Sequence, residues 1–456
     1  MMIKKSNITD EQVQLILSIE ESHFVDLKSK RIEPAKLTRT ISAFSNAEGG
    51  EIYVGIEDEP RIWAGFDNIE EANAHIRVFE ELFPLGDGYE YEFLENKKHN
   101  GLVLKIDIEK NRAIKSASNG KAYLRRAAQN LVQDSQEQID RLKRNKGIIS
   151  FETETIAVET DIVENSNAII KFMIDVIPSA EPITWLKKQR LIIGEHPTVA
   201  GILLFCDEPQ AILPKQSGIK IYQYSTKEKE GTRDSLMFAP LTIEGCIYDL
   251  IKNSVAKTIE IIESIRVMTA EGLKNVSYPM EALHEIVTNA VLHRDYSITD
   301  DIHIRIYDNR VEIQSPGTLP GHITTENILD ERFARNGVLV RLINKFPEPP
   351  NKDVGEGLNT AFDSMRKMRL KEPTIEQKGA NVLITLKHES LGTPQELIMT
   401  FFETHETITN KQARDICNIN SENAMKHILR RMVDAEMIDV IQGESRFKTA
   451  YRKKNI

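Results

Sequence analysis

The sequence predicts a multidomain protein of the mixed α/β (α+β) class, and three observations support this prediction. A chain of 456 residues is long enough for about three domains. Short β-rich runs alternate with stretches of helical apolar spacing, which favours layers of helix and sheet. Residues 394–456 change to three helices and a β-hairpin, the layout of a winged helix-turn-helix. We therefore divide the chain into residues 1–148, a middle α/β connection over 160–275, an α/β sandwich over 276–390, and residues 394–456.

The composition is that of an ordinary globular chain, with 40% apolar and 28% charged residues. No apolar run approaches the roughly 20 residues of a membrane span, so we expect no membrane partner. Cys206, Cys246 and Cys417 lack metal-ligand spacing and are expected as core residues in a reducing compartment, which predicts a cytoplasmic protein. The net charge of −10 argues against a protein that coats nucleic acid, but it leaves local basic patches open.

The first stretch mixes helices and strands. Helices are expected over 10–20 and 35–47, where apolar residues recur at helical spacing, and Gly49-Gly50 ends the second helix. Strands are expected at the β-rich runs 51–58, 102–108 and 122–124. Residues 134–147 are polar and charged, and we expect them to form a helix before a linker.

The middle and later stretches continue this alternation. We expect a helix near 165–176, a buried strand at 202–205, a strand at 218–224 and a long helix over 242–267. Residues 278–388 then predict a helix, a strand pair, loops, a helix and a strand. In the last stretch, helices are expected over 394–404, 410–417 and 421–438, followed by a hairpin around Gln442-Gly443.

One predicted helix carries a polar stripe that is suited to nucleotide chemistry. Glu285, Asn289 and His293 are spaced i, i+4 and i+8 beside an apolar face. The Asn289 oxygen can bind Mg²⁺, and Glu285 can orient or deprotonate a water molecule. Two glycine turns follow, at 315–321 and 354–362, where backbone N–H groups could approach phosphates. The alternative is a solvated Glu and Asn on an ordinary helix, with glycines at ordinary turns.

The order of these motifs resembles the GHKL family of ATPases, in the divergent branch found next to Schlafen-like domains, over about residues 180–388. The matching residues are Glu285, Asn289-Ala290, His293-Arg294-Asp295-Tyr296, Ser315-Pro316-Gly317, Arg335-Asn336, Gly355-Glu356-Gly357-Leu358 and the phrase HPTVAGILLF at 196–205. The resemblance implies a GHKL-type sandwich that binds ATP and Mg²⁺. It also implies a homo-oligomer, because GHKL relatives commonly dimerise when ATP binds.

The same resemblance assigns roles to single residues. Asn289 would hold magnesium and Glu285 would activate water, while Gly317, Gly355 and Gly357 would line the adenine and phosphate sides. His293 and Arg335 are further cofactor-binding candidates. Better-known members carry an Asp in the first glycine box that reads the adenine amino group. This chain has none there, and Asp308 on the preceding strand is the nearest candidate.

A second group of candidate residues lies near the N-terminus. If residues 23–28 form a strand, Asp26 and Lys28 point to the same face. Glu21 precedes this strand, and Asp58 ends another. Gathered carboxylates can bind Mg²⁺ or Mn²⁺ for phosphodiester cleavage, and a lysine can offset phosphate charge. The alternative is a set of exposed charges that flank strands.

These residues resemble the Schlafen core, a divergent Alba-like (Alba-2 type) domain, over about residues 12–130. The matching residues are Glu21-Ser22, Asp26-Leu27-Lys28, Ala43-Phe44, Asn46, Gly49-Gly50 and Gly55-Ile56-Glu57-Asp58. In nucleolytic members three acidic residues cut RNA, often transfer RNA. The resemblance implies Glu21, Asp26 and Asp58 as their counterparts, with Lys28 as the basic helper. Asp26 stands where the family has Glu, and Leu27 where it has an aromatic residue.

Three functions remain open from the sequence. The first is an ATP-binding ATPase whose nucleotide state gates a Schlafen-like RNA nuclease, in stress or phage defence. The second is an ATP-responsive DNA-binding regulator, which would read DNA through the basic residues Lys426, His427, Arg430 and Arg431. The third is an ATPase that acts through protein partners. A cluster of basic residues supports a nucleic-acid partner, namely Lys110, Arg112, Lys115, Lys121, Arg125 and Arg126.

Overall fold

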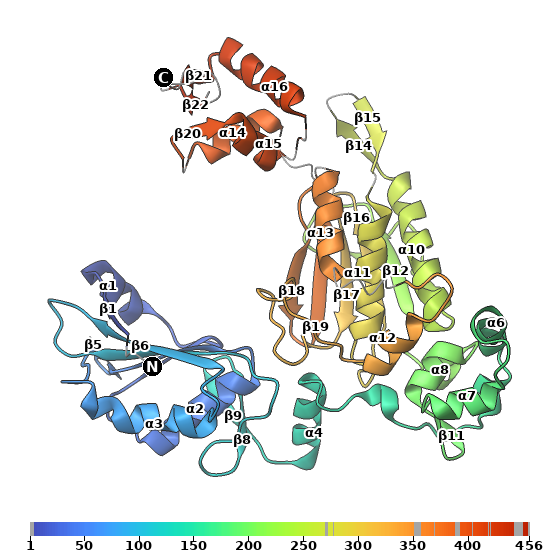
Figure 1. Ribbon diagram of the computed structural model, residues 1–456, viewed down its shortest axis with the longest axis horizontal. Helices are drawn as coiled ribbons and strands as arrows, with labels where there is room; N and C mark the ends of the chain where they lie inside the picture. The colour runs from blue at the N-terminus through green and yellow to red at the C-terminus, as the bar shows by residue number, and fades with distance from the viewer. Residues whose placement is uncertain are drawn as a thin grey trace.

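The computed structural model describes residues 4–269, 272–276, 278–350, 357–368, 370–387, 393–403, 405–417, 419, 421–441 and 450–454. Figure 1 shows an N-terminal body in blue, a central body in green to orange and a C-terminal body in red. In this part of the chain, no helix has the length and apolar character needed to cross a membrane. Helices and sheets occur together in each body, which confirms the mixed α/β class.

The N-terminal body is built on a five-stranded sheet. Its order is β1 (Lys5–Asn7), β6 (Tyr89–Glu95), β7 (Val103–Ile108), β3 (Gly50–Val54) and β2 (Val25–Lys28). Helices α2 (Pro34–Asn46) and α3 (Asn73–Leu82) bury their apolar sides against one face. Helix α1 (Asp10–Ser18) and the hairpin of β4 (Ile56–Asp58) and β5 (Arg61–Trp63) pack on the other face. The sheet is therefore covered on both sides.

Two elements connect this body to the centre. The hairpin of β8 (Ala122–Arg126) and β9 (Gln129–Gln133) packs on α2. Helix α4 (Gln136–Asn145) follows, and Ser135 and Gln138 form a capping box at its start. The charged segment expected as a helix is therefore a helix, and it lies between the N-terminal and central bodies (Figure 1).

Residues 202–205 form part of a helix, so the strand expected there is wrong. The helices in the first part of the central body are η2 (Phe151–Thr153), α5 (Asp161–Glu164), α6 (Asn167–Val176), α7 (Pro182–Lys188), α8 (Val199–Phe205) and α9 (Pro209–Ile212), and the short strands β10 (Ile192–Ile193) and β11 (His196–Pro197) pair between α7 and α8. Thr198 caps α8, since its Oγ1 accepts a hydrogen bond from the Gly201 amide at 3.2 Å. All seven residues of α8 are buried. A continuous apolar run does not distinguish a buried strand from a buried helix.

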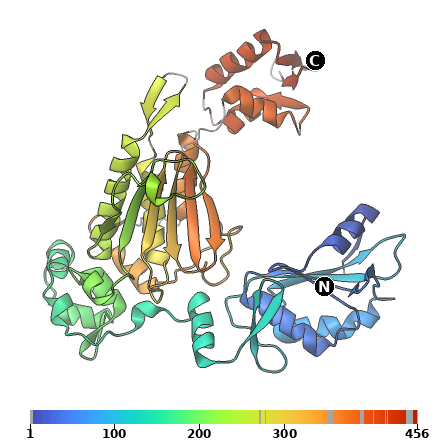
Figure 2. The same cartoon turned by 180° about the vertical axis from the view of Figure 1, so that it is seen from behind.

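The second part of the central body is a six-stranded sheet. Its order is β13 (Leu241–Ile243), β12 (Ile219–Tyr224), β16 (Ile302–Tyr307), β17 (Arg310–Pro316), β19 (Asn381–Lys387) and β18 (Thr374–Lys378). Helices α10 (Ile247–Ser264), α11 (Met280–His293) and α13 (Gly357–Lys367) lie side by side on one face, and Figure 2 shows the strands from the opposite side. Helix α12 (Gly337–Ile343) lies near α8.

Strands on both sides of residue 275, the expected domain boundary, belong to this six-stranded sheet. Strand β12 pairs in parallel with β16, and one continuous hydrophobic core runs from Val163 to Leu386. The hairpin of β14 (Arg266–Thr269) and β15 (Gly272–Asn275) follows α10 directly. Helix α10 begins at Ile247 rather than 242, because residues 241–243 pair with β12 as an edge strand.

The C-terminal body has the elements α14 (Pro394–Phe401), β20 (Thr407–Thr409), α15 (Asn410–Cys417), α16 (Glu422–Asp434), β21 (Ile438–Ile441) and β22 (Ala450–Lys453). Ile398, Met425 and Leu429 form part of its separate core, and its strands have the order β20-β22-β21. The turn expected at Gln442-Gly443 lies outside the described residues.

Candidate functional site

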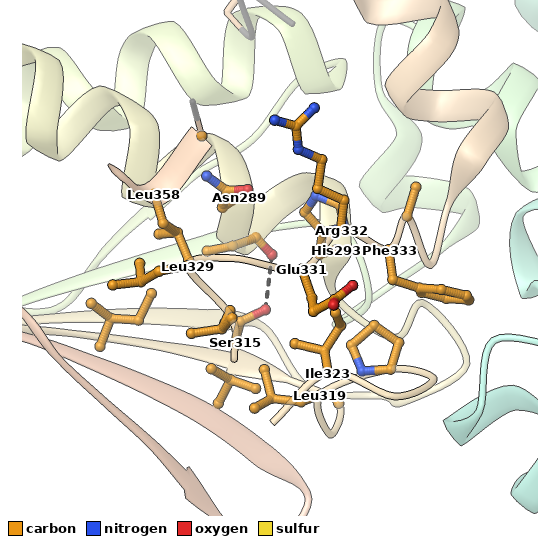
Figure 3. A pocket seen from close by; sticks show the side chains of 18 of the residues that line it. Asn289, His293, Ser315, Leu319, Ile323, Leu329, Glu331, Arg332, Phe333 and Leu358 are labelled. Atoms are coloured by element: carbon orange, nitrogen blue, oxygen red, sulfur yellow. Dashed lines mark hydrogen bonds between the residues drawn. The ribbon is translucent and has the colours of Figure 1, made fainter. Parts of the chain in front are cut away.

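A cavity of about 290 Å³ opens where α11 faces the loop that follows β17. Glu285, Asn289 and His293 line it from α11, as the spacing predicted, and Figure 3 labels Asn289 and His293. Helix α11 turns this stripe inward because Leu283, Ile286 and Val287 on its apolar side are fully buried in the core. The opposite wall comes from the loop after β17, which includes Leu319, Ile323, Leu329, Arg332 and Phe333.

Glu285 and Asn289 form one polar unit in this cavity. The Asn289 amide nitrogen donates to the Glu285 carboxyl oxygen Oε1 at 2.6 Å and to the Glu285 carbonyl oxygen at 2.9 Å. The Asn289 amide oxygen takes no part in these two hydrogen bonds, and an amide oxygen is a ligand type that Mg²⁺ accepts. Burial raises the pKa of Glu285, although the hydrogen bond from Asn289 opposes this shift. A carboxylate with a raised pKa is a better proton acceptor, as a general base requires.

His293 contributes a neutral side chain to the same cavity. Burial lowers the pKa of His293 to about 4, and the positive charge of Arg335 adds to this effect. At neutral pH the imidazole therefore carries one donor and one acceptor nitrogen and no charge. It can hydrogen-bond a ligand, but it does not supply a cation for phosphate.

Two glycines shape the walls of the cavity. Gly317 has a φ of +120°, and a Cβ atom there would stand 3.0 Å from both Cβ and N of Asp295. Only glycine fits this close approach, which brings the loop after β17 against the end of α11. Gly357 has a φ of +26° and faces Glu285 Oε1. The expected Gly355 lies outside the described residues.

The structure places Arg335 and Asp308 away from the cavity lining. Arg335 is 4% exposed and lies behind the wall, where it donates to the Thr318 carbonyl oxygen at 2.6 Å and to Asp295 Oδ2 at 3.3 Å. Asp308 lies in the turn between β16 and β17, at the opposite end of β17 from Gly317. Asp295 is instead the acidic residue beside this glycine turn, although it was noted only as part of a matching motif.

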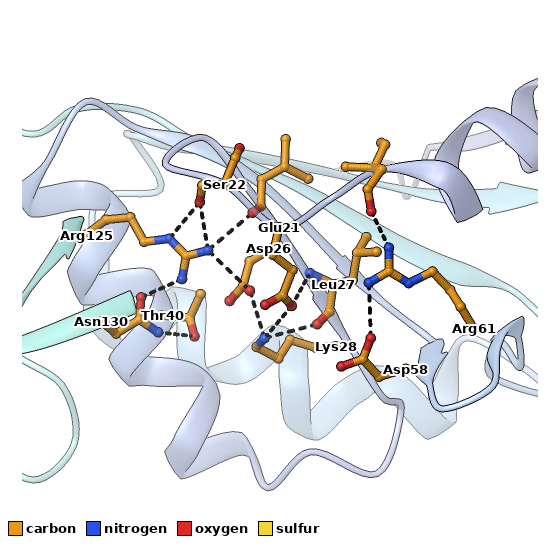
Figure 4. Close-up of polar contacts among 12 residues, drawn as sticks. Glu21, Ser22, Asp26, Leu27, Lys28, Thr40, Asp58, Arg61, Arg125 and Asn130 are labelled. Atoms are coloured by element: carbon orange, nitrogen blue, oxygen red, sulfur yellow. Dashed lines mark hydrogen bonds and ion pairs between the residues drawn. The ribbon is translucent and has the colours of Figure 1, made fainter. Parts of the chain in front are cut away.

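The N-terminal carboxylates form a second polar cluster (Figure 4). Lys28 Nζ donates to Asp26 Oδ1 at 2.8 Å and to Glu21 Oε1 at 3.1 Å, so the ammonium group joins Asp26 of β2 to Glu21, which precedes this strand. Behind them, the Arg125 guanidinium lies 3.3 Å from Asp26 Oδ1 and donates to the Ser22 and Val25 carbonyl oxygens. From the sequence, Arg125 was expected only as one of several basic residues, because its partners lie about 100 residues away along the chain.

The two carboxyl groups of this cluster differ in acidity. Asp26 is 1% exposed, and burial raises its pKa to about 6 against the opposing charge of Lys28. Burial also acts on Glu21, but its hydrogen bond with Asp26 and the Lys28 charge together hold the pKa of Glu21 below its usual value. The Asp26 oxygen Oδ2 has no hydrogen-bond partner among the described residues, although it is buried. Such an oxygen is an available ligand atom for a cation.

Asp58 is not assembled with this pair. Its side chain is 74% exposed and forms an ion pair with Arg61 at 3.1 Å. Across the described ranges, no group of three His, Cys, Asp or Glu side chains is arranged to hold a metal ion. Of the three carboxylates expected to gather around a metal ion, only Glu21 and Asp26 therefore lie together, with the Lys28 ammonium group between them.

Family models match two parts of the chain: one holds Glu21 and Asp26, and the other holds the cavity wall after β17 but not α11, which ends at His293. Residues 21–134 match the family model described as "Schlafen, AlbA_2", and residues 299–386 match the one described as "Putative ATP-dependent DNA helicase recG C-terminal". The protein therefore joins a Schlafen-like domain to an ATPase-like domain. These matches mark it as a nucleic-acid-related protein of ATPase type, with nucleotide and nucleic acid as the ligands that they indicate.

Other comparisons add less. No curated protein matches the chain. Among solved structures, the crystal structure of the DIP2311 protein from Corynebacterium diphtheriae shares 16% identity, with a TM-score of 0.43, over 97% of this chain and 96% of that one.

Proposed function

We propose that this protein binds ATP with Mg²⁺ in the α11 cavity and hydrolyses it, and that its nucleotide state gates metal-dependent RNA cleavage at Glu21 and Asp26. One observation carries the nucleotide part. The Glu285–Asn289 pair lines a cavity, and one wall of this cavity contains Gly317, whose φ is positive. Enclosed sites with few convergent polar groups are typical of small-molecule ligands.

Within this proposal the residues of the cavity divide the work. Bound Mg²⁺ would neutralise phosphate charge, and the Asn289 oxygen is the atom that would hold it. Glu285 orients the attacking water and accepts its proton, which its raised pKa favours. Apolar residues of the opposite wall, such as Leu319, Ile323 and Leu329, would cover the base. Arg332 lies in the same wall and offers a cation for the phosphates.

The nuclease part is supported by the second cluster. Glu21 and Asp26 are the carboxylates that would hold Mg²⁺ or Mn²⁺, and Lys28 would approach the scissile phosphate. Asp58 remains a proposed third carboxylate. Its contribution to metal binding would be smaller, because its side chain pairs with Arg61. A nuclease under nucleotide control would suit phage defence, and transfer RNA is the first substrate to try.

The proposal is tested by incubating the protein with transfer RNA, Mn²⁺ and ATP, and by comparing it with the Asp26→Asn variant. Cleavage that requires both the metal and Asp26 is expected. Intact RNA under all these conditions would reject the nuclease part. Calorimetric titration with ATP and Mg²⁺ tests the nucleotide part separately, and light scattering with and without ATP tests the proposed homo-oligomer.

A second candidate function rests on α16. Lys426, His427, Arg430 and Arg431 are all exposed on this helix, which is the third helix of the proposed winged helix. Such a basic helix face is suited to the DNA major groove. An ATP-responsive regulator would give salt-sensitive duplex binding that Arg430→Ala weakens. Duplex binding that is unchanged in this variant would exclude α16 as the reading element.

A further inference from the structure

Lys110 belongs to the Schlafen-like domain, yet its ammonium group holds the wall of the nucleotide cavity. Its side chain is 5% exposed. Nζ donates to the carbonyl oxygens of Leu319 at 2.8 Å and Ile323 at 2.9 Å, and both of these residues line the cavity. Hydrogen bonds from a charged donor in a buried setting are among the stronger ones in proteins. The cavity wall therefore takes part of its shape from the other domain.

A closed ring of contacts surrounds this ammonium group. Glu48 Oε2 pairs with Lys110 Nζ at 2.9 Å, and Glu48 Oε1 accepts from Gln377 Nε2 at 3.2 Å. Gln377 Oε1 in turn accepts from the Leu319 amide at 2.9 Å. Two residues of the ring come from the Schlafen-like domain and two from the central body. Each polar group of the ring is satisfied across the junction, so movement of the wall must disturb Glu48.

Glu48 stands two residues before β3, the strand that pairs with β2 of the carboxylate cluster. Gly49 and Gly50 follow it, both with positive φ, and β3 begins at Gly50. The close packing here admits no side chain, because a Cβ atom at Gly50 would lie 2.5 Å from the Phe24 carbonyl oxygen. The Glu51 amide donates to that same oxygen at 2.7 Å. Strand β3 then pairs with β2 in parallel, with Asp26 opposite Ile52.

We propose that Lys110 is a positioning residue for the nucleotide cavity, and that the Lys110–Glu48 pair links occupancy of this cavity to strand β2 and its Asp26. The inference rests on the proposed nucleotide binding at the α11 site. A ligand that presses on Leu319 and Ile323 changes the carbonyl positions that Lys110 binds, and Glu48 transmits the change to β3. The coupling works in both directions, because linkage between two binding equilibria is reciprocal.

The affinity of the full chain for ATP with Mg²⁺ is the first measurement. Lys110→Met keeps the length of the side chain but removes the charge and the donors, and it leaves two buried carbonyl groups unsatisfied. Binding is expected to weaken by about tenfold or more. Lys97→Met is the matched control, since Lys97 is an exposed lysine of the same domain. The affinity of this variant for ATP with Mg²⁺ should equal that of the wild type.

The second measurement is the change in hydrogen–deuterium exchange that ATP causes in β2 and β3. A Lys110 that only stabilised the fold would not be needed for this response to ATP. In the wild type, ATP with Mg²⁺ should alter exchange in peptides that cover residues 24–28 and 50–54. In Lys110→Met at saturating ATP this response should disappear. Glu48→Gln keeps the shape of the ring without its charge, so it serves as the second variant if Lys110→Met does not fold. It should reduce the response while ATP still binds.

The possible outcomes separate the inference from the proposed function. A wild type that binds no ATP rejects the nucleotide site itself. A wild type that binds ATP with no difference in Lys110→Met overturns the positioning role. Weaker binding in Lys110→Met with an unchanged exchange response in residues 24–28 overturns the link to β2.

Discussion

Gly147 lies directly against the aromatic ring of Phe333, so that a Cβ atom at residue 147 would stand 2.3 Å from Phe333 Cε1. The Arg112 guanidinium lies over the same ring, 4.9 Å from its centroid. Phe333 thus contacts two segments of the N-terminal half, and it also lines the α11 cavity. The contact makes the junction between the halves sensitive to a single methyl group.

Gly147→Ala is therefore expected to destabilise the protein by about 2–4 kcal/mol, since a backbone with φ +64° and a steric clash act together. Gly120→Ala is the control, because Gly120 has a φ of +76° and no atom within 4 Å of the added Cβ. Gly120→Ala should lower the free energy of unfolding by only about 1 kcal/mol. Thermal unfolding measures both variants, and equal losses would mean that the Phe333 contact does not hold in solution.

Glu285→Gln is expected to lower ATP turnover by about 100-fold or more, with ATP affinity changed by less than about threefold, because the general base is lost while the site remains. Asn289→Ala should instead weaken binding of ATP with Mg²⁺ by about tenfold. Phosphate release and calorimetry separate these effects. Glu281→Gln, one turn earlier on α11 and exposed, should match the wild type. Full turnover in Glu285→Gln would assign the base to another residue.

Asp26→Asn is expected to reduce Mn²⁺-dependent RNA cleavage by more than about 100-fold, because it removes the buried member of the carboxylate pair. Asp58→Asn should reduce this cleavage by less than about tenfold, since the Asp58 side chain is exposed and pairs with Arg61. Gel analysis of labelled transfer RNA compares the two variants. A larger loss in Asp58→Asn would show that Asp58 moves to join the pair when the metal binds.

Lys146 gives a pH dependence with a definite sign. Its Nζ is buried and donates to the carbonyl oxygens of Ser45, at 3.0 Å, and Asn111. Burial lowers its pKa to about 7 from the ordinary 10.5, and the charge of Lys110 adds to this. Between these two values the unfolded chain holds a proton that the folded chain has released, so the free energy of unfolding rises with pH.

Above pH 7, Lys146 is expected to raise the free energy of unfolding by up to about 1.4 kcal/mol per pH unit. The Lys146→Met variant should lack this contribution. Urea unfolding at pH 7, 8 and 9 measures the difference between this variant and the wild type. Lys143→Met, in the last turn of helix α4 just before Lys146, is the control and should keep the wild-type slope. Parallel curves for wild type and Lys146→Met would mean that the buried amine remains charged.

Much of the fold followed from periodicity in the sequence. Helix α2 was expected because Leu37, Ile41 and Phe44 recur at helical spacing, and they do face the core. Residues 202–205 were misassigned, since an apolar run buried on all sides has no polar face to reveal its period. Helix α3 and strand β6 were not expected, although both contribute to the N-terminal core.

The candidate site was predicted where its residues lie close together in sequence. Glu285, Asn289 and His293 share one helix face, so their spacing alone brought them together. The opposite wall and the roles of Arg335 and Arg125 could not be predicted in this way. Arg335 reaches Arg144 across 191 residues, and Arg125 reaches Asp26 across about 100. Such contacts depend on tertiary packing, which local patterns do not encode.

The ring formed by Lys110, Glu48, Leu319 and Gln377 also bears on how this chain can evolve. A recombination event that replaced the N-terminal domain alone would leave the Leu319 and Ile323 carbonyl groups without their cation. Three of these positions depend on side chains, namely 48, 110 and 377. We therefore expect them to substitute in concert among related chains, so that the two domains are inherited as one unit.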